Sequence, residues 1–320
     1  MKSKLIGLTA KILAFLLPTK VMRSKQYFNL WETKGYHITP VQFYESVPDT
    51  RDFKRNIFEN DSNLLGIEIN EQGQINLLED FQQKYKNEYS EFRYGKSENK
   101  NDFYFYNNSF ETVDAEILYC MIRKYKPQRI IEIGSGFSTL LTARAIRQNR
   151  IEDSKYICEL ICIEPYPSEW IEKIPEVKKI IKSKVENIQL SEFENLKEND
   201  ILFIDSSHVI NIYNDVCFEY LDVLPSLNIG VIVHIHDILM PQKYSESWYE
   251  QKYFWNEQYL LQAFLAFNTS FSVMWSGNYM HLKYPTKLDN AFISYSKFKS
   301  NKDRTKNKQG HKSFWIQRIK

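Results

Sequence analysis

The stretch Arg129-Ile-Ile-Glu-Ile-Gly-Ser-Gly-Phe-Ser138 decides the fold of this chain. Its three isoleucines form a short, β-branched apolar run that predicts a buried strand. Gly134 and Gly136 end this strand, and a helical pattern of apolar residues follows over 140–146. A strand, a glycine turn and a helix in this order are typical of the first unit of a nucleotide-binding α/β fold, because the glycines let the backbone approach a ligand.

Glu132 stands just before this turn and narrows the class of ligand. A carboxylate at that position would repel a pyrophosphate and would attract a ligand that carries positive charge. The turn reads Gly-x-Gly-x-Ser-Thr and lacks the third glycine of the dinucleotide-binding fingerprint. Both features disfavour an NAD-dependent oxidoreductase, which stays open as an alternative, and both favour a sulfonium nucleoside with an amino-acid tail.

The composition sets limits on the size, the partners and the location of the protein. The 320 residues suffice for one large domain or two modest ones, and 43% of them are hydrophobic, which allows a sizeable core. A formal net charge of +2 is too small to produce a positive electrostatic field that attracts nucleic acid, so we expect no such partner. The four cysteines lie in apolar segments, which disfavours a disulfide framework or a zinc site and predicts a reducing, cytoplasmic location.

The N-terminal residues 2–17 carry apolar side chains at helical spacing among several lysines. Lys11 interrupts this run, no acidic residue precedes Glu32, and the run is too short to span a bilayer. Two alternatives stay open for the helix predicted here. It packs on the body of the protein or on a second subunit of a homo-oligomer, or it lies on a membrane surface as a peripheral contact.

After residue 110, strand patterns alternate with helix patterns, which predicts a parallel, doubly wound α/β sheet. Strands are expected at 129–133, 160–163, within 168–182, and at 201–204, 230–235, 271–275 and 313–318. Residues 285–311 show no clear pattern and are expected to be irregular, with a mobile loop at 297–310. The predicted parts are a basic amphipathic helix, an N-terminal appendage or cap, and the main domain, at residues 1–25, 26–110 and 111–320.

Four of the predicted strands have an acidic residue at or next to their carboxyl end: Glu132, Glu164, Asp205 and Asp237. In an open α/β sheet the ligand binds at the carboxyl ends of the strands, so we expect these four acids to converge on one cleft. Glu164 ends the second strand, where a carboxylate suits a ribose diol.

These motifs resemble those of class I S-adenosylmethionine-dependent methyltransferases, and in particular a bacterial branch that acts on small molecules. The resemblance covers roughly residues 35–320. It implies a seven-stranded, mostly parallel sheet whose last strand is antiparallel and lies beside the strand at 271–275, with an N-terminal helical and irregular appendage. The motifs that carry it are Glu132-Ile-Gly-Ser-Gly-Phe-Ser138, Ile163-Glu-Pro165, Phe203-Ile-Asp-Ser-Ser-His208 and His234-Ile-His-Asp237.

The resemblance also implies roles for the residues of the turn. Gly134, Gly136 and Ser138 would form the turn that holds S-adenosylmethionine. Glu132 would lie near the methionine moiety of this cofactor. A purely structural alternative for Glu132 is that it caps the helix that follows.

The resemblance further assigns roles to acids at the later strand ends. Glu164 would hold the ribose hydroxyls, and Glu186 would lie by the adenine. Asp205 would face the methyl donor and the acceptor. A structural alternative for Asp205 is that it caps the turn that follows its strand.

Methyl transfer is an in-line displacement at carbon, so the enzyme must align donor and acceptor and ease loss of the acceptor's proton. One alternative is a divalent metal held by Asp205, His236 and Asp237, as the resemblance to metal-dependent O-methyltransferases implies. A histidine in this set suits manganese, iron or zinc better than magnesium. The other alternative is metal-free, with His208 or His236 as general base beside Asp205. For His234 the structural alternative is a hydrogen-bonded core residue.

We therefore predict an S-adenosylmethionine-dependent transferase of biosynthesis that O-methylates a hydroxyl of a small molecule or a glycan. A non-catalytic, cofactor-binding domain of a biosynthetic assembly is a further alternative to the oxidoreductase. The aromatic loop at 244–255 is expected to form a lid over the acceptor or a subsidiary aromatic core.

Overall fold

The computed structural model describes residues 2–16, 21, 24–52, 58, 61–99, 101–300 and 311–320. The chain divides into two compact units, Met1–Ile57 and Phe58–Lys320. In the first unit the helix predicted from the apolar spacing forms as α1 (Lys2–Leu16), and the remaining elements are short: Lys25–Tyr27, α3 (Phe28–Glu32) and Thr50–Asp52. None of the helices in the described ranges is long and apolar enough to cross a bilayer.

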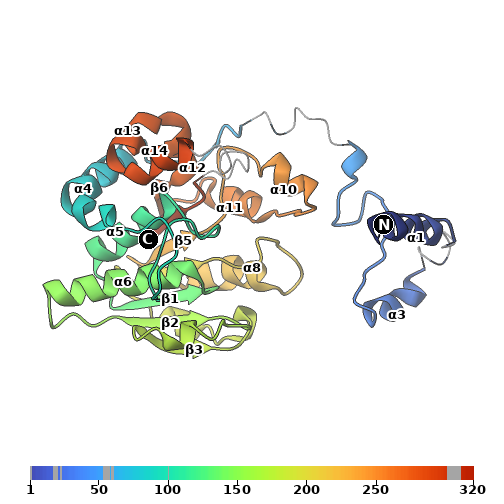
Figure 1. The fold of residues 1–320 in the computed structure, drawn as a ribbon, viewed down its shortest axis with the longest axis horizontal. Coiled ribbons are helices and arrows are strands. Elements are labelled where there is room, and N and C mark those ends of the chain that lie inside the picture. Colours follow the sequence, from blue (N-terminus) through green and yellow to red (C-terminus); the bar gives the residue numbers. More distant parts are fainter. Residues whose placement is uncertain are drawn as a thin grey trace. The chain divides into compact units, whose positions relative to one another are not determined.

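The second unit is built on a seven-stranded sheet in the order β3-β2-β1-β4-β5-β7-β6 (Figure 1). The pairs from β3 to β5 are parallel, whereas β7 is antiparallel to both of its neighbours, β5 and β6. The predicted doubly wound sheet with an antiparallel last strand is confirmed. The strands are β1 (Arg129–Ile133), β2 (Glu159–Ile163), β3 (Val177–Ile181), β4 (Ile201–Ile204), β5 (Ile232–Ile235), β6 (Phe271–Ser276) and β7 (Phe314–Arg318).

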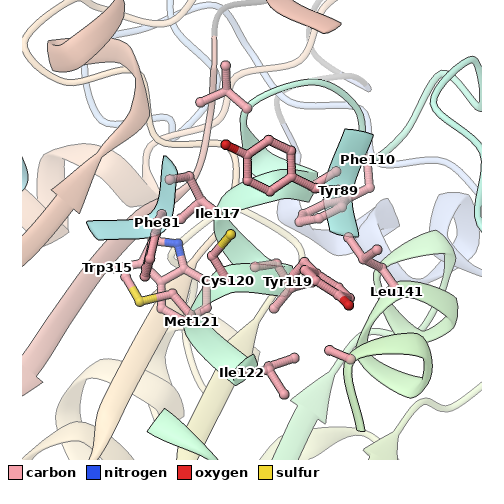
Figure 2. Packing of buried hydrophobic residues seen from close by; sticks show 14 of the residues in the cluster. Phe81, Tyr89, Phe110, Ile117, Tyr119, Cys120, Met121, Ile122, Leu141 and Trp315 are labelled. Carbon is pink, nitrogen blue, oxygen red and sulfur yellow. The ribbon is translucent and has the colours of Figure 1, made fainter. Parts of the chain in front are cut away.

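Helices cover both faces of the sheet, because successive strand residues point to opposite sides. Ile130 of β1 belongs to one hydrophobic core and Ile131 to the other. Figure 2 shows part of the first core, in which buried side chains come from distant parts of the chain, such as Phe81, Tyr119 and Trp315.

The helices of the second unit follow the predicted alternation over most of their length. The helix between β4 and β5 forms as three joined segments, α8 (Asp215–Phe218), a π turn (Glu219–Val223) and α9 (Leu224–Ser226). The other helices before residue 270 are α4 (Glu71–Ser90), α5 (Asp114–Tyr125), α6 (Phe137–Glu152), α7 (Ser191–Glu194), α10 (Glu246–Glu250) and α11 (Glu257–Leu265).

The expectation of an irregular segment at 285–311 is wrong for its described part. After α12 (Gly277–Lys283), the chain forms α13 (Pro285–Ala291) and α14 (Ile293–Ser300), while residues 301–310 of the predicted mobile loop lie outside the described ranges. These helices have polar sequences and bury few side chains. Too few apolar residues therefore recur at helical spacing for the helices to be predicted from the local sequence.

Helix α4 ties the segment before residue 111 to the sheet. The Asn70 amide donates to the carbonyl of Val273 at 2.8 Å, and Gln74 accepts the N–H of Ser276 at 2.7 Å. In Figure 1, α4 lies beside α13, and the two helices are in contact. The second compact unit therefore includes α4 together with the sheet.

Asp200 fastens the starts of β1 and β4 together. Its carboxylate accepts the backbone N–H groups of Gln128, Arg129 and Lys197 at 2.8–2.9 Å. We expect Asp200→Ala to lower the free energy of unfolding by about 3 kcal/mol, because three part-buried backbone donors lose their buried acceptor. Urea denaturation measures the change, and exposed Asp222→Ala is the control, expected to change it by less than about 0.5 kcal/mol. A loss below about 1 kcal/mol for Asp200→Ala would contradict this role.

Candidate active site

The turn after β1 lies against the end of β4. Gly134 has a φ of +78°, and a Cβ atom there would collide with the carbonyl oxygen of Asp205. The N–H of Asp205 donates to the carbonyl of Ile133 at 3.0 Å, which holds the two strand ends together. Gly136 differs, since a Cβ atom at this position would meet nothing within 4 Å. The fold itself requires the first glycine, whereas the second borders open space in which a ligand can lie.

Glu132 is buried at the base of this turn. Its Oε1 accepts a hydrogen bond from the Ser138 hydroxyl at 2.6 Å, while its Oε2 has no partner among the described residues. Burial raises the pKa of Glu132 to about 8, although hydrogen bonds from Ser138 and Thr139 lower it. The bond to Ser138 joins two side chains, and no backbone N–H of α6 is capped by Glu132. A cationic ligand group would satisfy Oε2, since buried polar atoms rarely stay unpaired.

The acids after β2 and β3 lie at the same edge of the sheet. Glu164 is half-buried and accepts the N–H of Tyr166 at 2.9 Å and, at 3.4 Å, the N–H of Ser135 in the glycine turn. Glu186 lies in the 3-10 turn after β3, where Lys184 is 3.9 Å away. The structure thus brings Glu164 directly to the turn and places Glu186 one strand further out.

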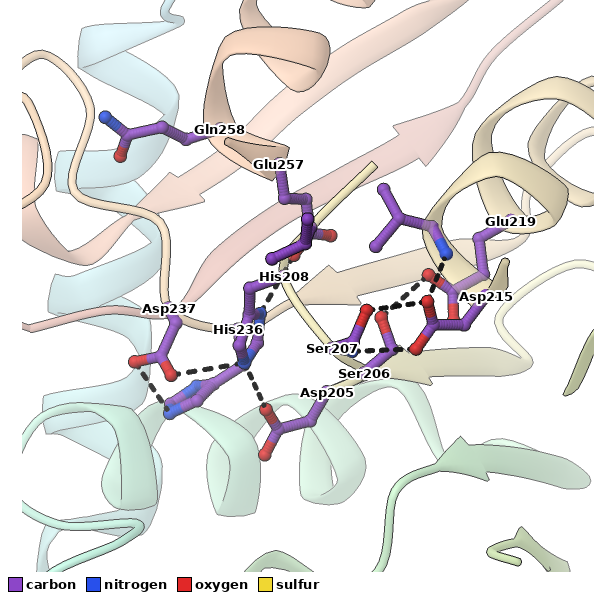
Figure 3. Close-up of polar contacts among 12 residues, drawn as sticks. Asp205, Ser206, Ser207, His208, Asp215, Glu219, His236, Asp237, Glu257 and Gln258 are labelled. Atoms are coloured by element: carbon purple, nitrogen blue, oxygen red, sulfur yellow. Dashed lines mark hydrogen bonds and ion pairs between the residues drawn. The ribbon is translucent and has the colours of Figure 1, made fainter. Parts of the chain in front are cut away.

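The ends of β4 and β5 converge on His208 (Figure 3). Its Nε2 lies 3.3 Å from Asp205 Oδ1 and 3.3 Å from Asp237 Oδ2, and its Nδ1 lies 2.9 Å from Glu257 Oε2. One ligand atom each from Asp205, His208 and Asp237 lies within 4.8 Å of the others, a spacing that can hold a metal ion. We call Asp205, His208, Asp237 and Glu257 the polar cluster.

Glu257 opens α11 and fixes the imidazole of His208 from behind. It is fully buried and also accepts a hydrogen bond from the Tyr220 hydroxyl at 3.2 Å. The backbone N–H groups of Asn256 and Glu257 donate to the His208 carbonyl, and the Asn256 side chain accepts the N–H of Ile210. The sequence prediction misses Glu257, because an acid in the first turn of a helix usually faces solvent near the helix dipole.

Lys312 supplies a cation to the polar cluster and is the second residue that the sequence prediction misses. Its Nζ lies 2.8 Å from Asp237 Oδ1, and its backbone N–H and that of Ser313 donate to Asp114 at 2.9–3.1 Å. Its one sequence signal is that it stands just before β7, the strand that pairs with β5.

The polar cluster is ionic even without a ligand. Burial lowers the pKa of His208, but its hydrogen bonds with Asp205 and Glu257 and the charge of Asp237 outweigh this and hold the pKa well above its usual range. Burial raises the pKa of Asp237, yet Lys312 and the nearby histidines bring it well below the usual range. Without a bound cation, His208 therefore keeps its proton near neutral pH, and a metal ion that binds its Nε2 would have to displace this proton.

His236, which the sequence places in both the metal set and the catalytic set, lies at the side of the polar cluster. Its Nε2 is 3.8 Å from Asp237 Oδ1, and its ring packs 5.2 Å from Phe110. Its Nδ1 is buried without a partner among the described residues. The residue that the structure groups with Asp205 and Asp237 is therefore His208.

His234 lies in β5, inside the core. Its ring stacks on Phe203 with centroids 4.0 Å apart, and its Nε2 lies 3.0 Å from the Ser313 hydroxyl. Burial keeps the pKa of His234 well below its usual range. These contacts are those of the hydrogen-bonded core residue that the sequence leaves open as an alternative.

Aromatic side chains from the loop at 244–255 cover the polar cluster. The Trp255 ring lies 4.5 Å from the His208 ring, and buried Trp248 lies 5.0 Å from Lys312 Nζ. Tyr253 stacks on Trp255 at 5.5 Å and keeps about half of its surface exposed. The inner rings of the loop form a small aromatic core, and its outer ring faces solvent.

Comparison with known proteins identifies the family of the chain. A family model described as a methyltransferase domain matches residues 131–238, which span β1 to the end of β5. An uncharacterized protein of Archaeoglobus fulgidus is 32% identical over 176 residues, which cover 52% of this chain and 77% of that protein. The chain belongs to the class I S-adenosylmethionine-dependent methyltransferases.

Two solved structures are similar to this methyltransferase at low sequence identity. One is the O-methyltransferase from Bacillus cereus in complex with SAH, at 13% identity and a TM-score of 0.35, covering 77% of this chain and 91% of that one. The other is a putative protein-L-isoaspartate O-methyltransferase from Plasmodium falciparum in complex with S-adenosyl-L-homocysteine, at 13% identity and a TM-score of 0.27, covering 51% and 83%.

Family membership makes S-adenosylmethionine the methyl donor and decides against the NAD-dependent oxidoreductase and the non-catalytic domain. The residues present fit this cofactor. Open space lies in front of Gly136, a half-buried carboxylate of Glu164 stands beside the turn, and Glu132 offers an unpaired oxygen to a cation.

The two glycines of the turn give a matched pair of variants. Gly134→Ala is expected to lower the free energy of unfolding by about 3 kcal/mol or more, because its Cβ collides with backbone at a positive φ. Gly136→Ala is expected to change it by less than about 1 kcal/mol, yet to weaken binding of S-adenosylhomocysteine. Denaturation and calorimetry measure the two effects. Equal affinity of Gly136→Ala and the parent protein would contradict a cofactor lying against this residue.

Glu164→Gln tests the expected ribose contact without a change of shape. We expect the affinity for S-adenosylhomocysteine to fall at least about tenfold, since a hydrogen bond to a charged group is lost. Calorimetry on the folded variant measures it. Glu169→Gln, an exposed acid on the same connection after β2, should bind like the parent protein. An unchanged affinity in Glu164→Gln would sink the ribose assignment.

Proposed function

We propose that this methyltransferase O-methylates a hydroxyl of a small molecule or a glycan, assisted by a divalent metal ion held by Asp205, His208 and Asp237. The observation that carries the proposal is the convergence of these three side chains at the ends of β4 and β5. They stand beside the glycine turn, since Gly134 packs on the backbone of Asp205. A ligand at the turn would therefore have the polar cluster as its neighbour.

The hydrogen bonding of His208 supports a cation at this place. When its Nδ1–H donates to Glu257, its Nε2 turns toward two carboxylate oxygens, each 3.3 Å away. Three electron-rich atoms at this spacing repel each other unless a proton or a metal ion lies between them. Ligand atoms around one ion with bonds of about 2.1 Å are about 3.0–3.4 Å apart, which agrees with the two distances to the imidazole nitrogen, while the two carboxylate oxygens lie within 4.8 Å of each other.

The donor set favours a particular group of metals. One imidazole nitrogen and two carboxylate oxygens suit manganese, iron or zinc better than magnesium, which prefers oxygen alone. Glu257 would orient the ligating imidazole, as carboxylates behind metal-bound histidines commonly do. A bound divalent ion supplies Lewis acidity that lowers the pKa of a hydroxyl group.

The other residues of the site have roles in positioning and in excluding water. Glu164 and the glycine turn would hold the nucleoside part of the cofactor, and Glu132 would face its cationic end. Lys312 balances one oxygen of Asp237 and leaves the other oriented toward His208. Trp255 shields the imidazole, so that polar contacts inside are less weakened by solvent.

The cellular compartment and the biosynthetic role are also part of the proposal. Four free cysteines, three of them buried, support a reducing compartment such as the cytoplasm. A biosynthetic role follows from the class of acceptor proposed, because methylation of a hydroxyl modifies a finished or growing product rather than releasing energy.

Activity with labelled S-adenosylmethionine on a panel of hydroxylated acceptors tests the function. We expect label on oxygen, loss of turnover with chelator, and recovery on adding manganese. Label on nitrogen or carbon would contradict O-methylation. Turnover that persists with chelator would remove the metal and leave the methyl transfer to the side chains.

Measuring metal binding in two variants distinguishes His208 from His236 as the metal ligand. His208→Asn is expected to lower the affinity for manganese at least about a hundredfold, because a ligand is lost, whereas His236→Asn should keep most of it. Calorimetry with manganese measures this without turnover, and circular dichroism controls for folding. The reverse order of the two variants would restore His236 as the ligand and overturn the set proposed here.

A further inference from the structure

Helix α1 carries apolar side chains that no described residue of its own compact unit covers. Leu5, Leu8, Ile12 and Leu16 are each about half exposed or more, and Phe15 is 89% exposed. Isolated apolar side chains are common on surfaces, but a whole helix of them marks an interaction surface.

The sequence of α1 has two sides. Leu5 and Ile12 are seven residues apart and therefore share one side of the helix with Leu16. Lys4 and Lys11 are also seven apart in the sequence, and in a regular helix that spacing places them on a shared side about 100° from Leu5 and Ile12. A wide apolar side beside lysines is the pattern of a helix that lies in a membrane interface.

The charge of this segment selects the kind of surface. Residues 1–31 contain six basic residues and no acidic one: Lys2, Lys4, Lys11, Lys20, Arg23 and Lys25. The rest of the chain has four more acidic than basic residues, since the protein as a whole has a net charge of +2. A concentrated positive charge next to apolar side chains is complementary to anionic phospholipid and gives no advantage for packing against a neutral protein surface.

The length of α1 decides how it would bind. Its 15 residues extend about 22 Å, less than the roughly 30 Å of a bilayer's hydrocarbon core. We propose that α1 binds the surface of an anionic phospholipid bilayer, with its apolar side in the interface and its lysines at the headgroups. This surface is separate from the methyl-transfer site, and its test does not depend on the proposed acceptor or metal.

Co-sedimentation of the full chain with vesicles tests the proposal. We expect binding to vesicles that contain phosphatidylglycerol, little binding to phosphatidylcholine alone, and release at high salt, because screening weakens the lysine contacts. Leu5→Gln/Ile12→Gln should weaken binding at least about tenfold by removing apolar side chains without changing the charge. Lys4→Gln/Lys11→Gln should weaken it about 25-fold, or about fivefold for each charge.

The matched control changes the opposite side of the same helix. Ala10→Gln/Ala14→Gln adds the same side chains away from the apolar side and should sediment like the parent protein. Calorimetry with S-adenosylhomocysteine should give the same affinity for all variants, which controls for folding of the body. The proposal would be overturned if the parent protein failed to bind anionic vesicles. It would also be overturned if Ala10→Gln/Ala14→Gln weakened vesicle binding as much as Leu5→Gln/Ile12→Gln does. Self-association without lipid, measured by ultracentrifugation, would also overturn it if Leu5→Gln/Ile12→Gln abolished the self-association and left vesicle binding unchanged.

Discussion

The close approach of Gly134 to the carbonyl of Asp205 is the contact on which the site depends. β1 and β4 are neighbours at the point where the strand order reverses, so the turn after one must pass over the end of the other. Only a residue without a Cβ fits there, and this one φ of +78° also directs the chain toward α6. The same approach joins the cofactor turn to the residues that would handle the acceptor.

The polar cluster is held together by the cost of burying charge. His208, Asp237 and Glu257 are all buried, and an unpaired charge at any of them would be expensive, so each is satisfied by the next. The contacts run from the backbone bonds of Asp114 through Lys312 to Asp237, and from there through His208 to the start of α11. Segments far apart in the sequence are thereby fixed to one another at the carboxyl edge of the sheet.

Local patterns predicted the sheet well because its strands are short, apolar and bounded by glycines and acids. The antiparallel last strand and its place beside the strand at 271–275 followed from the family resemblance, and both are confirmed. The helices α13 and α14 could not be predicted in this way, since α13 is bonded to α4, some 200 residues earlier in the chain, and Ser294 of α14 is bonded to Glu116 of α5. A polar segment becomes a helix here because distant residues accept and donate to it.

By itself, the sequence determined the strand–turn–helix unit and the acids that end the strands, because strand periodicity and glycine conformation act between near neighbours. Only the tertiary structure decided which histidine joins Asp205 and Asp237. His208 and Asp237 both have positive φ values, 61° and 54°, so their side chains leave the regular strand directions. Lys312 and Glu257 reach the same point from β7 and α11. The spacing of residues in the sequence does not predict these contacts, because they depend on how the helices and strands pack.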